Sequence, residues 1–239
     1  MLGLHHAARL ETLLPTDAGA TTLSPAWKML LFGDGSPTRL LSLLAGAPLA
    51  VSVLGMGALA GDGSGGSGGG GGSGGGGSAA AEESALGALW APLAGAAAAL
   101  APPRVQRRVW LEAPAGQRVG YACSWWGAGD AAACLPDSSV PIGGALAAQR
   151  REIHRELLGV AHAAGHAGLE EGLGLGGSSS GSGSGSGGEL PPAGGDWGPR
   201  ELWGRWYVMR QGGAPLCVVY EVFSPALERL LGPRHAQSA

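Results

Sequence analysis

Charged residues fall at two places inside stretches of the sequence that are otherwise apolar. The first is Glu221, which lies in the run from Leu216 to Phe223 and on the same strand face as Cys217 and Val219. A carboxylate that is buried without a partner is strongly destabilising, so Glu221 must be exposed, ion-paired or functional. The open alternatives are therefore an edge strand with one solvated glutamate, a structural ion pair, or an acid that takes part in binding or catalysis.

The second place is the pair Arg107 and Arg108, within the strand-like run from Val105 to Glu112. Neighbouring residues of a strand point to opposite faces, so one of the two arginines faces the core whichever way the strand is turned. An inward arginine needs an anion, which either Glu221 or a ligand carboxylate would supply. Charge-assisted hydrogen bonds contribute about 1.5–3 kcal/mol each, so a bound organic acid would be held firmly. A surface arginine is the remaining alternative.

Other residue types that could carry chemistry lack the spacing that the chemistry needs. His162 and His166 are four residues apart on a predicted helix, but no third zinc ligand is suitably placed. The glycine-rich tracts lack the Gly-Lys-Ser/Thr of a phosphate-binding loop. The three cysteines form no Cys-x-x-Cys pair, which favours free thiols in a reducing compartment. No metal site and no phosphate-binding loop is therefore expected.

Charge and hydropathy exclude further classes. The formal net charge is −3 and no basic stripe is present, which argues against a nucleic-acid partner. The apolar stretch from Leu86 to Ala101 is short, rich in alanine and interrupted by Pro92, so no membrane span is predicted. Early acidic residues argue against a secretory signal and leave an organellar transit peptide open.

The elements that must position Glu221 and the arginines follow from hydrophobic periodicity and turn residues. A helix is expected after Ser24, with Pro25 in its first turn, and a second helix is expected after Ser36 or Thr38. Strand-like runs follow at 49–54, 105–112, 119–126, 203–209 and 216–223, the last four of them forming two hairpins.

One further helix is predicted from Ile142 onward. Its apolar residues are spaced by seven, four and three, at Leu146, Ile153, Leu157 and Val160, which places them on one helical face. Strands and helices thus come in separate groups without regular alternation. That arrangement predicts an α+β fold with a mainly antiparallel sheet.

The glycine content is concentrated in two tracts, at about 61–78 and 172–188. Gly/Ser repeats offer almost no side chain to bury and lose much backbone entropy on ordering, so both tracts are expected to be flexible insertions. The sequence then predicts a single domain over 23–232 that these insertions interrupt, with tails at 1–22 and 233–239.

Four sets of motifs, in order along the chain, resemble the chorismate lyases. The clearest is the pair Leu202-Trp203-Gly204-Arg205 and Tyr220-Glu221-Val222-Phe223-Ser224-Pro225, which is similar to the C-terminal hairpin of that family. The resemblance is strongest to the branch found in cyanobacteria and algal plastids. The other matching segments are 27–31 with 34–39, 108–111 with 124–126, and 141–143 with 153–156.

This resemblance implies a fold and an activity. The family fold is an antiparallel sheet of about six strands, whose helices and flaps enclose a buried ligand site. The implied enzyme is a cofactor-free carbon–oxygen lyase and is expected to be a monomer. It splits chorismate, its small-molecule partner, into pyruvate and 4-hydroxybenzoate, a precursor of plastoquinone- or ubiquinone-type quinones. The branch resemblance implies the plastid stroma as the location, with a cytoplasmic location as the alternative.

The resemblance also assigns roles to particular residues. Arg108 would bind the ring carboxylate, and Glu221 would face the oxygen at C4, either as a base or only as a hydrogen-bond partner. The substrate-binding backbone would lie at Pro37 and Thr38 and at Ile142 and Gly143. Proline has no N–H to donate, so the hydrogen bond expected at Pro37 would be lost or made by a neighbour, Thr38 or Ser36.

Two other readings remain open on the sequence. One is a non-catalytic sensor of small aromatic acids on the same fold, as in the ligand-binding domains of some transcription regulators. Such domains accompany a helix-turn-helix, for which the segment before Ser24 is too short. The other is a homologue that folds but neither binds nor reacts.

Overall fold

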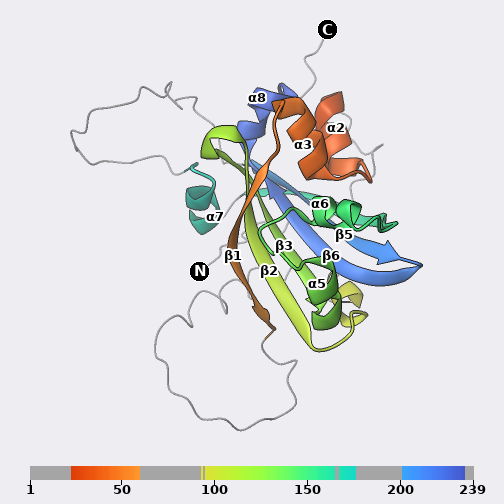
Figure 1. The fold of residues 1–239 in the computed structure, drawn as a ribbon. Helices are drawn as coiled ribbons and strands as arrows, with labels where there is room; N and C mark the ends of the chain where they lie inside the picture. The colour runs from red at the N-terminus through yellow and green to blue at the C-terminus, as the bar shows by residue number, and fades with distance from the viewer. Residues whose placement is uncertain (1–22, 60–92, 94, 165–166, 176–200, 235–239) are drawn as a thin grey trace, which may run out of the picture.

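The structure, a computed structural model, describes residues 23–59, 93, 95–164, 167–175 and 201–234. Its centre is one sheet of six antiparallel strands in the order β1-β2-β3-β6-β5-β4 (Figure 1). The strands are β1 (Ala50–Ala58), β2 (Arg104–Glu112), β3 (Arg118–Gly127), β4 (His154–Ala164), β5 (Glu201–Gln211) and β6 (Ala214–Phe223). The predicted α+β fold with an antiparallel sheet is confirmed.

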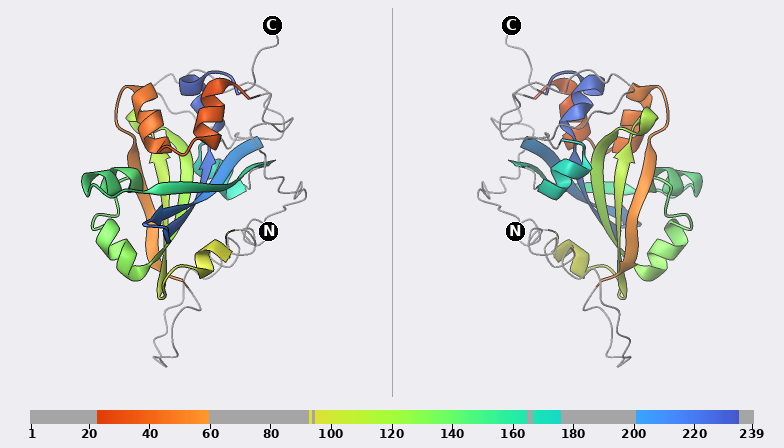
Figure 2. Two further views of the ribbon diagram at one scale, coloured as in Figure 1. Left: turned by 90° about the vertical axis from the view of Figure 1, so that its right-hand side faces the viewer. Right: turned by 90° about the vertical axis from the view of Figure 1, so that its left-hand side faces the viewer.

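Helices cover both faces of the sheet. On one face lie α2 (Pro25–Phe32), α3 (Pro37–Ala45), α5 (Ala128–Cys134) and α6 (Ile142–Ala148), together with α8 (Glu228–Leu231). The helical residues 95–98 and α7 (Ala167–Gly172) pack against the other face. Figure 2 shows α5 and α6 in green on one side of the sheet and the short yellow helix on the other.

The predicted helix starts are confirmed. Ser24 is the N-cap of α2, with Pro25 in the first turn. Ser36 caps α3, because its hydroxyl accepts a hydrogen bond from the backbone N–H of Arg39, and Gly46 ends that helix in the left-handed conformation at φ 68°. Pro37 occupies the first helical position, where the missing N–H is tolerated.

The two predicted hairpins are also confirmed. β2 and β3 are joined through the short 3-10 helix Pro114–Gly116. β5 and β6 turn at Gly212 and Gly213, whose φ angles of 57° and 84° suit a tight hairpin turn that favours glycine. Both turns could be predicted correctly because a turn depends only on residues close together in sequence.

The long helix predicted from Ile142 is wrong. α6 ends at Ala148, and the segment from His154 to Ala164 is the edge strand β4. The strand register shifts between Leu157 and Gly159, so Leu157 and Val160 face the same core although they are three residues apart. A β-bulge thus gave the spacing of three that is otherwise typical of a helix.

The boundary of the second glycine tract also needs correction. Gly172 is the last residue of α7, and Leu173 is buried against Trp110 on the second face of the sheet. A side chain at Gly172 would collide with the indole of Trp110. The tract 61–78 and residues 176–188 lie outside the described residues, as do the predicted tail 1–22 and residues 235–239 of the predicted tail 233–239.

Candidate functional site

Glu221 lies on β6, in the interior of the sheet, and is only 5% exposed. Its carboxylate has two partners on the neighbouring strand β5. The Nε of Arg205 donates to Oε2 at 2.9 Å, and the hydroxyl of Tyr207 donates to Oε1 at 3.2 Å. Of the three alternatives for Glu221, the solvated edge-strand glutamate is therefore wrong, and an ion pair is present.

Arg205 ties this carboxylate to the loop that follows α2. Its Nη1 donates to the carbonyls of Leu30 and Gly33 at 2.7 and 2.9 Å. Burial by itself lowers the pKa of Arg205, but the charges of Glu221 and Tyr207 and the hydrogen bonds to both of them together outweigh burial, so the pKa is raised. The pKa of Tyr207 is also raised, first by burial and then by the charge of Glu221. At neutral pH Arg205 is therefore a cation, and Tyr207 keeps the proton that it donates.

Arg107 is the buried member of the arginine pair and is 2% exposed. Its Nε and Nη2 donate to the carbonyl of Ser138 at 2.9 and 2.7 Å, and Nη2 also donates to the carbonyl of Val140 at 3.0 Å. Burial lowers the pKa of Arg107 to about 10, an effect that the charge of Asp137 partly opposes. The result at neutral pH is a buried cation whose hydrogen-bond partners in the described part of the chain are neutral carbonyls.

Arg108 lies on the opposite face of the sheet. In the register of the central strands, Arg107 pairs with Ser124 and then Val219, which is on the Glu221 face, whereas Arg108 pairs with Cys123. Cys123 belongs to the hydrophobic cluster on the other side. The structure therefore does not bring Arg108 and Glu221 together, and Arg107 is the member of the pair that lies on the Glu221 face.

The two backbone segments that were expected to bind substrate do meet. The hydroxyls of Ser36 and Thr38, at the start of α3, are hydrogen-bonded at 2.9 Å, and Pro37 between them is buried. A Cβ added at Gly143, near the start of α6 and next to Ile142, would lie 2.6 Å from the Ser36 hydroxyl. The absence of a side chain at Gly143 lets the two helix starts approach each other this closely.

Arg155 on β4 lies beside the same junction. Its Nη2 would be 3.6 Å from the Cβ position of Gly143, and its Nη1 donates to the carbonyl of Asp34 at 3.3 Å. Arg155 pairs with Met209, which faces the same side of the sheet as Tyr207 and Glu221. The junction of α3 and α6 is therefore bordered by a third arginine of this face.

These groups can together bind a small organic acid. Arg107 supplies a cation for a carboxylate, and the oriented carboxylate of Glu221 can accept a hydrogen bond from a hydroxyl.

Within the described ranges, no group of three or more histidine, cysteine, aspartate and glutamate residues could hold a metal ion. His162 lies on strand β4 rather than on a helix, and His166 is outside the described residues. No helix in the described part of the chain is long and apolar enough to cross a membrane.

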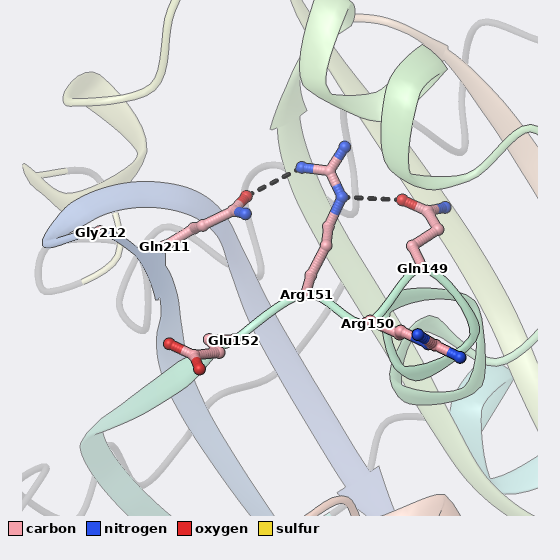
Figure 3. A pocket seen from close by; sticks show the side chains of 6 residues that line it. All are labelled: Gln149, Arg150, Arg151, Glu152, Gln211 and Gly212. Atoms are coloured by element: carbon pink, nitrogen blue, oxygen red, sulfur yellow. Dashed lines mark hydrogen bonds between the residues drawn. The ribbon is translucent and has the colours of Figure 1, made fainter.

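A separate hollow of about 710 Å³ lies at the end of the sheet (Figure 3). Its lining includes Arg151, which donates to Gln149 and Gln211 across the hollow. Gln211 is six residues beyond Arg205 on β5, or about 20 Å along the strand. This hollow is therefore remote from the Arg205–Glu221 pair.

Three members of the site were not predicted from the sequence. Arg205 and Tyr207 follow Trp203 at intervals of two, so alternation along β5 could have placed them on one face. Arg155 was hidden by the helix that was wrongly predicted over β4. Nothing local to Arg107 and Arg108 distinguishes them, because only the register of β2 decides which one points inward.

Comparison with known proteins identifies a family. The model of the family described as Rv2949c-like chorismate pyruvate-lyases matches residues 84–179 and 197–231, more than half of the chain. Those segments contain Arg107, Arg155, Arg205 and Glu221. No curated protein matches the chain.

Two of the solved structures that resemble the fold come from Mycobacterium smegmatis. PhnF is 13% identical with a TM-score of 0.45, and the match covers 80% of this chain and 64% of PhnF. The effector domain of PhnF is 12% identical with the same TM-score, and the match covers 80% of this chain and 90% of that domain. This chain thus spans less than two thirds of the length of PhnF. On the family match, the chain belongs to the Rv2949c-like chorismate pyruvate-lyase family.

Proposed function

We propose that this protein is a chorismate lyase, which eliminates pyruvate from chorismate and leaves 4-hydroxybenzoate. The observation that carries the proposal is the arrangement on one face of the sheet. A buried cation at Arg107 lies on the same face as the Glu221 carboxylate, which Arg205 and Tyr207 orient. A ring with a carboxylate at one end and a hydroxyl at the other would meet complementary groups at both ends.

The reaction needs no net oxidant or proton. The bond between ring carbon C3 and the enolpyruvyl oxygen breaks, and C4 loses its hydrogen as a proton. The departing enolpyruvate gains one proton at its methylene carbon and becomes pyruvate. Aromatisation of the ring supplies the driving force, so the protein has to bind, orient and desolvate the substrate.

In this proposal Arg107 takes the ring-carboxylate role that the sequence resemblance gave to Arg108. Its guanidinium already lies beside the segment that leads to Ile142 and Gly143. Glu221 accepts a hydrogen bond from the hydroxyl at C4, because a carboxylate held by two donors still has lone pairs to offer. Ser36 and Thr38 supply the polar groups at the position where Pro37 has no N–H.

The test is to incubate the pure protein with chorismate, to measure pyruvate with a coupled dehydrogenase, and to identify 4-hydroxybenzoate by mass. Arg107→Met should lower kcat/KM by about 100-fold or more, the usual effect of removing a buried group that stabilises charge. Arg108→Met is the matched control on the opposite face of the same strand and should stay within a few fold of the wild type. Melting temperatures establish that both variants are folded.

Three outcomes contradict the proposal in different ways. Folded wild-type protein that releases no pyruvate overturns the lyase activity. If calorimetry then shows that it still binds 4-hydroxybenzoate, the sensor alternative is supported instead. If Arg108→Met loses activity and Arg107→Met does not, the transfer of the carboxylate role from Arg108 to Arg107 is wrong.

The motif resemblance supports two further parts of the proposal. The 4-hydroxybenzoate would feed quinone synthesis, and the protein would work in the plastid stroma. A tagged protein that fractionates away from plastids would contradict the proposed location and leave the activity untouched.

A further inference from the structure

Arg155 has a hydrogen-bonding group for which the described structure offers no partner. Its Nε is buried and makes no hydrogen bond, while its Nη1 reaches only the carbonyl of Asp34 at 3.3 Å. Buried polar groups are nearly always hydrogen-bonded, and a buried donor without a partner is destabilising. An unpartnered guanidinium N–H beside a candidate binding site indicates that a ligand completes it.

The charges on this face of the sheet point to the kind of ligand. Arg107, Arg155 and Arg205 contribute three positive charges, whereas Glu221 contributes one negative charge and is already paired with Arg205. Two guanidinium groups therefore remain without a carboxylate from these strands. Asp137 lies near Arg107 but is exposed, so it offsets that charge only partly. The remaining positive charge suits a ligand with two negative charges.

The positions of the two arginines indicate that they serve different groups. β2 and β4 are separated by three strands, so the backbones of Arg107 and Arg155 are roughly 19 Å apart across the sheet. Arg107 reaches the carbonyl of Val140, and Arg155 comes close to Gly143. The two guanidinium groups thus lie near different residues of the short segment that begins α6, Arg107 at Val140 and Arg155 at Gly143.

We infer that Arg155 binds the second carboxylate of the substrate, the carboxylate of the enolpyruvyl group that leaves as pyruvate. This inference rests on the proposed function. Arg107 holds the ring carboxylate on one side of the start of α6, and Arg155 holds the side-chain carboxylate on the other, beside Ser36 and Gly143. Such an anchor orients the bond that breaks and favours a dicarboxylate substrate over the monocarboxylate product.

The test compares two ligands that do not react. One is 4-hydroxybenzoate, and the other is 4-hydroxy-3-(carboxymethoxy)benzoate, which carries a second carboxylate at the position of the enolpyruvyl group. Calorimetry should show tighter binding of the dicarboxylate to the wild type. Arg155→Met should weaken the dicarboxylate by about 10- to 100-fold, as for the loss of a charge-assisted hydrogen bond, and change 4-hydroxybenzoate by less than about threefold.

Two further variants separate a binding role from a structural one. Arg155→Lys keeps the charge and should recover part of the dicarboxylate affinity. Arg210→Met removes the same charge from β5, from a partly exposed pair with Glu156, and should leave both affinities unchanged. Melting temperatures measured on every variant show whether any loss of affinity is due to unfolding.

Several results would overturn the inference. Equal losses for both ligands in Arg155→Met would assign Arg155 to the ring carboxylate. No loss for either ligand would remove it from the site, and a wild type that binds neither ligand would overturn the inference and the proposed function together. A wild type that shows the predicted pattern of binding but releases no pyruvate would refute only the lyase activity.

Discussion

Arg205 and Glu221 form an ion pair of which both members are almost fully buried, at 1% and 5% exposure. Removing two such charges from water costs several kcal/mol per ion, so a buried pair contributes little net stability compared with apolar residues of the same volume. The pair instead fixes the positions of the groups around it. Arg205 donates its other N–H groups to carbonyls of α2 and of the loop after it, and Glu221 is held in one orientation by Arg205 and Tyr207.

The ionisation of the Tyr207 hydroxyl should change the stability of the protein at alkaline pH. Burial and the charge of Glu221 raise its pKa in the folded protein, whereas the unfolded chain ionises near pH 10. The stability that this tyrosine contributes is therefore fully present below pH 10 and is lost as the pH rises further. Above pH 10, Tyr207→Phe should lose stability less steeply than the wild type, by about 1.4 kcal/mol per pH unit.

The measurement is the free energy of unfolding in urea at several pH values between 7 and 11, with absorbance at 295 nm to follow tyrosinate. The mutant lacks one hydrogen bond, so it is already less stable at pH 7. The comparison therefore concerns only how steeply the free energy of unfolding changes with pH. Parallel slopes above pH 10 would show that Tyr207 ionises in the folded protein as freely as in the unfolded one.

At the scale of elements, the bulge in β4 decides how that strand packs. Beyond the register shift at Leu157, Gly159 pairs with Trp206 of β5. A Cβ at Gly159 would collide with the indole of Trp206, which is fully buried and has no room to move. The bulge lets Leu157 and Val160 face one core while Gly159 makes room for the indole on the other face.

Gly159→Ala should therefore destabilise the protein by about 1–3 kcal/mol, the usual range for overpacking a core. The measurement is the urea midpoint of unfolding, followed by tryptophan fluorescence. Gly57→Ala on β1 is the matched control, because a Cβ there meets nothing within 4 Å, and it should change stability by no more than about 0.5 kcal/mol. Equal effects of the two substitutions would mean that the contact with Trp206 does not cause the loss of stability.

At the scale of the whole molecule, the two ends of the described chain are tied together next to the site. The N–H of Ser24 donates to the carbonyl of Arg234 at 2.7 Å, and the indole N–H of Trp27 donates to the carbonyl of Gly232 at 3.1 Å. These bonds hold α2 in place. The same helix and the loop after it accept hydrogen bonds from Arg205, so the C-terminal segment supports the site indirectly, through α2.

Ending the chain after Leu231 removes both of these hydrogen bonds. We expect a loss of about 1–3 kcal/mol, because each bond contributes about 0.5–1.5 kcal/mol net. Thermal and urea unfolding measure the loss, and a chain that ends after Arg234 is the control, since it keeps both partners. If the two truncated proteins are equally stable, the tie between the ends does not support the fold.

Much of the fold was predictable because its signals are local. The hairpin turn at Gly212 and Gly213 and the caps at Ser24 and Ser36 depend on residues a few positions apart, and all were confirmed. β4 was missed because its bulge changed the period of the apolar residues from two to three. The membership of Glu221 in the apolar face of β6 also followed from alternation alone.

By itself the sequence determined the two hairpins, the strand face of Glu221 and the order of motifs that resemble one family. Only the tertiary structure decided that Arg107 rather than Arg108 lies on the Glu221 face of the sheet, that Arg205 is the partner of that carboxylate, and that Arg155 borders the site. The reason is strand register. A shift of one residue moves every side chain of a strand to the opposite face, and register is set by contacts between strands far apart in sequence.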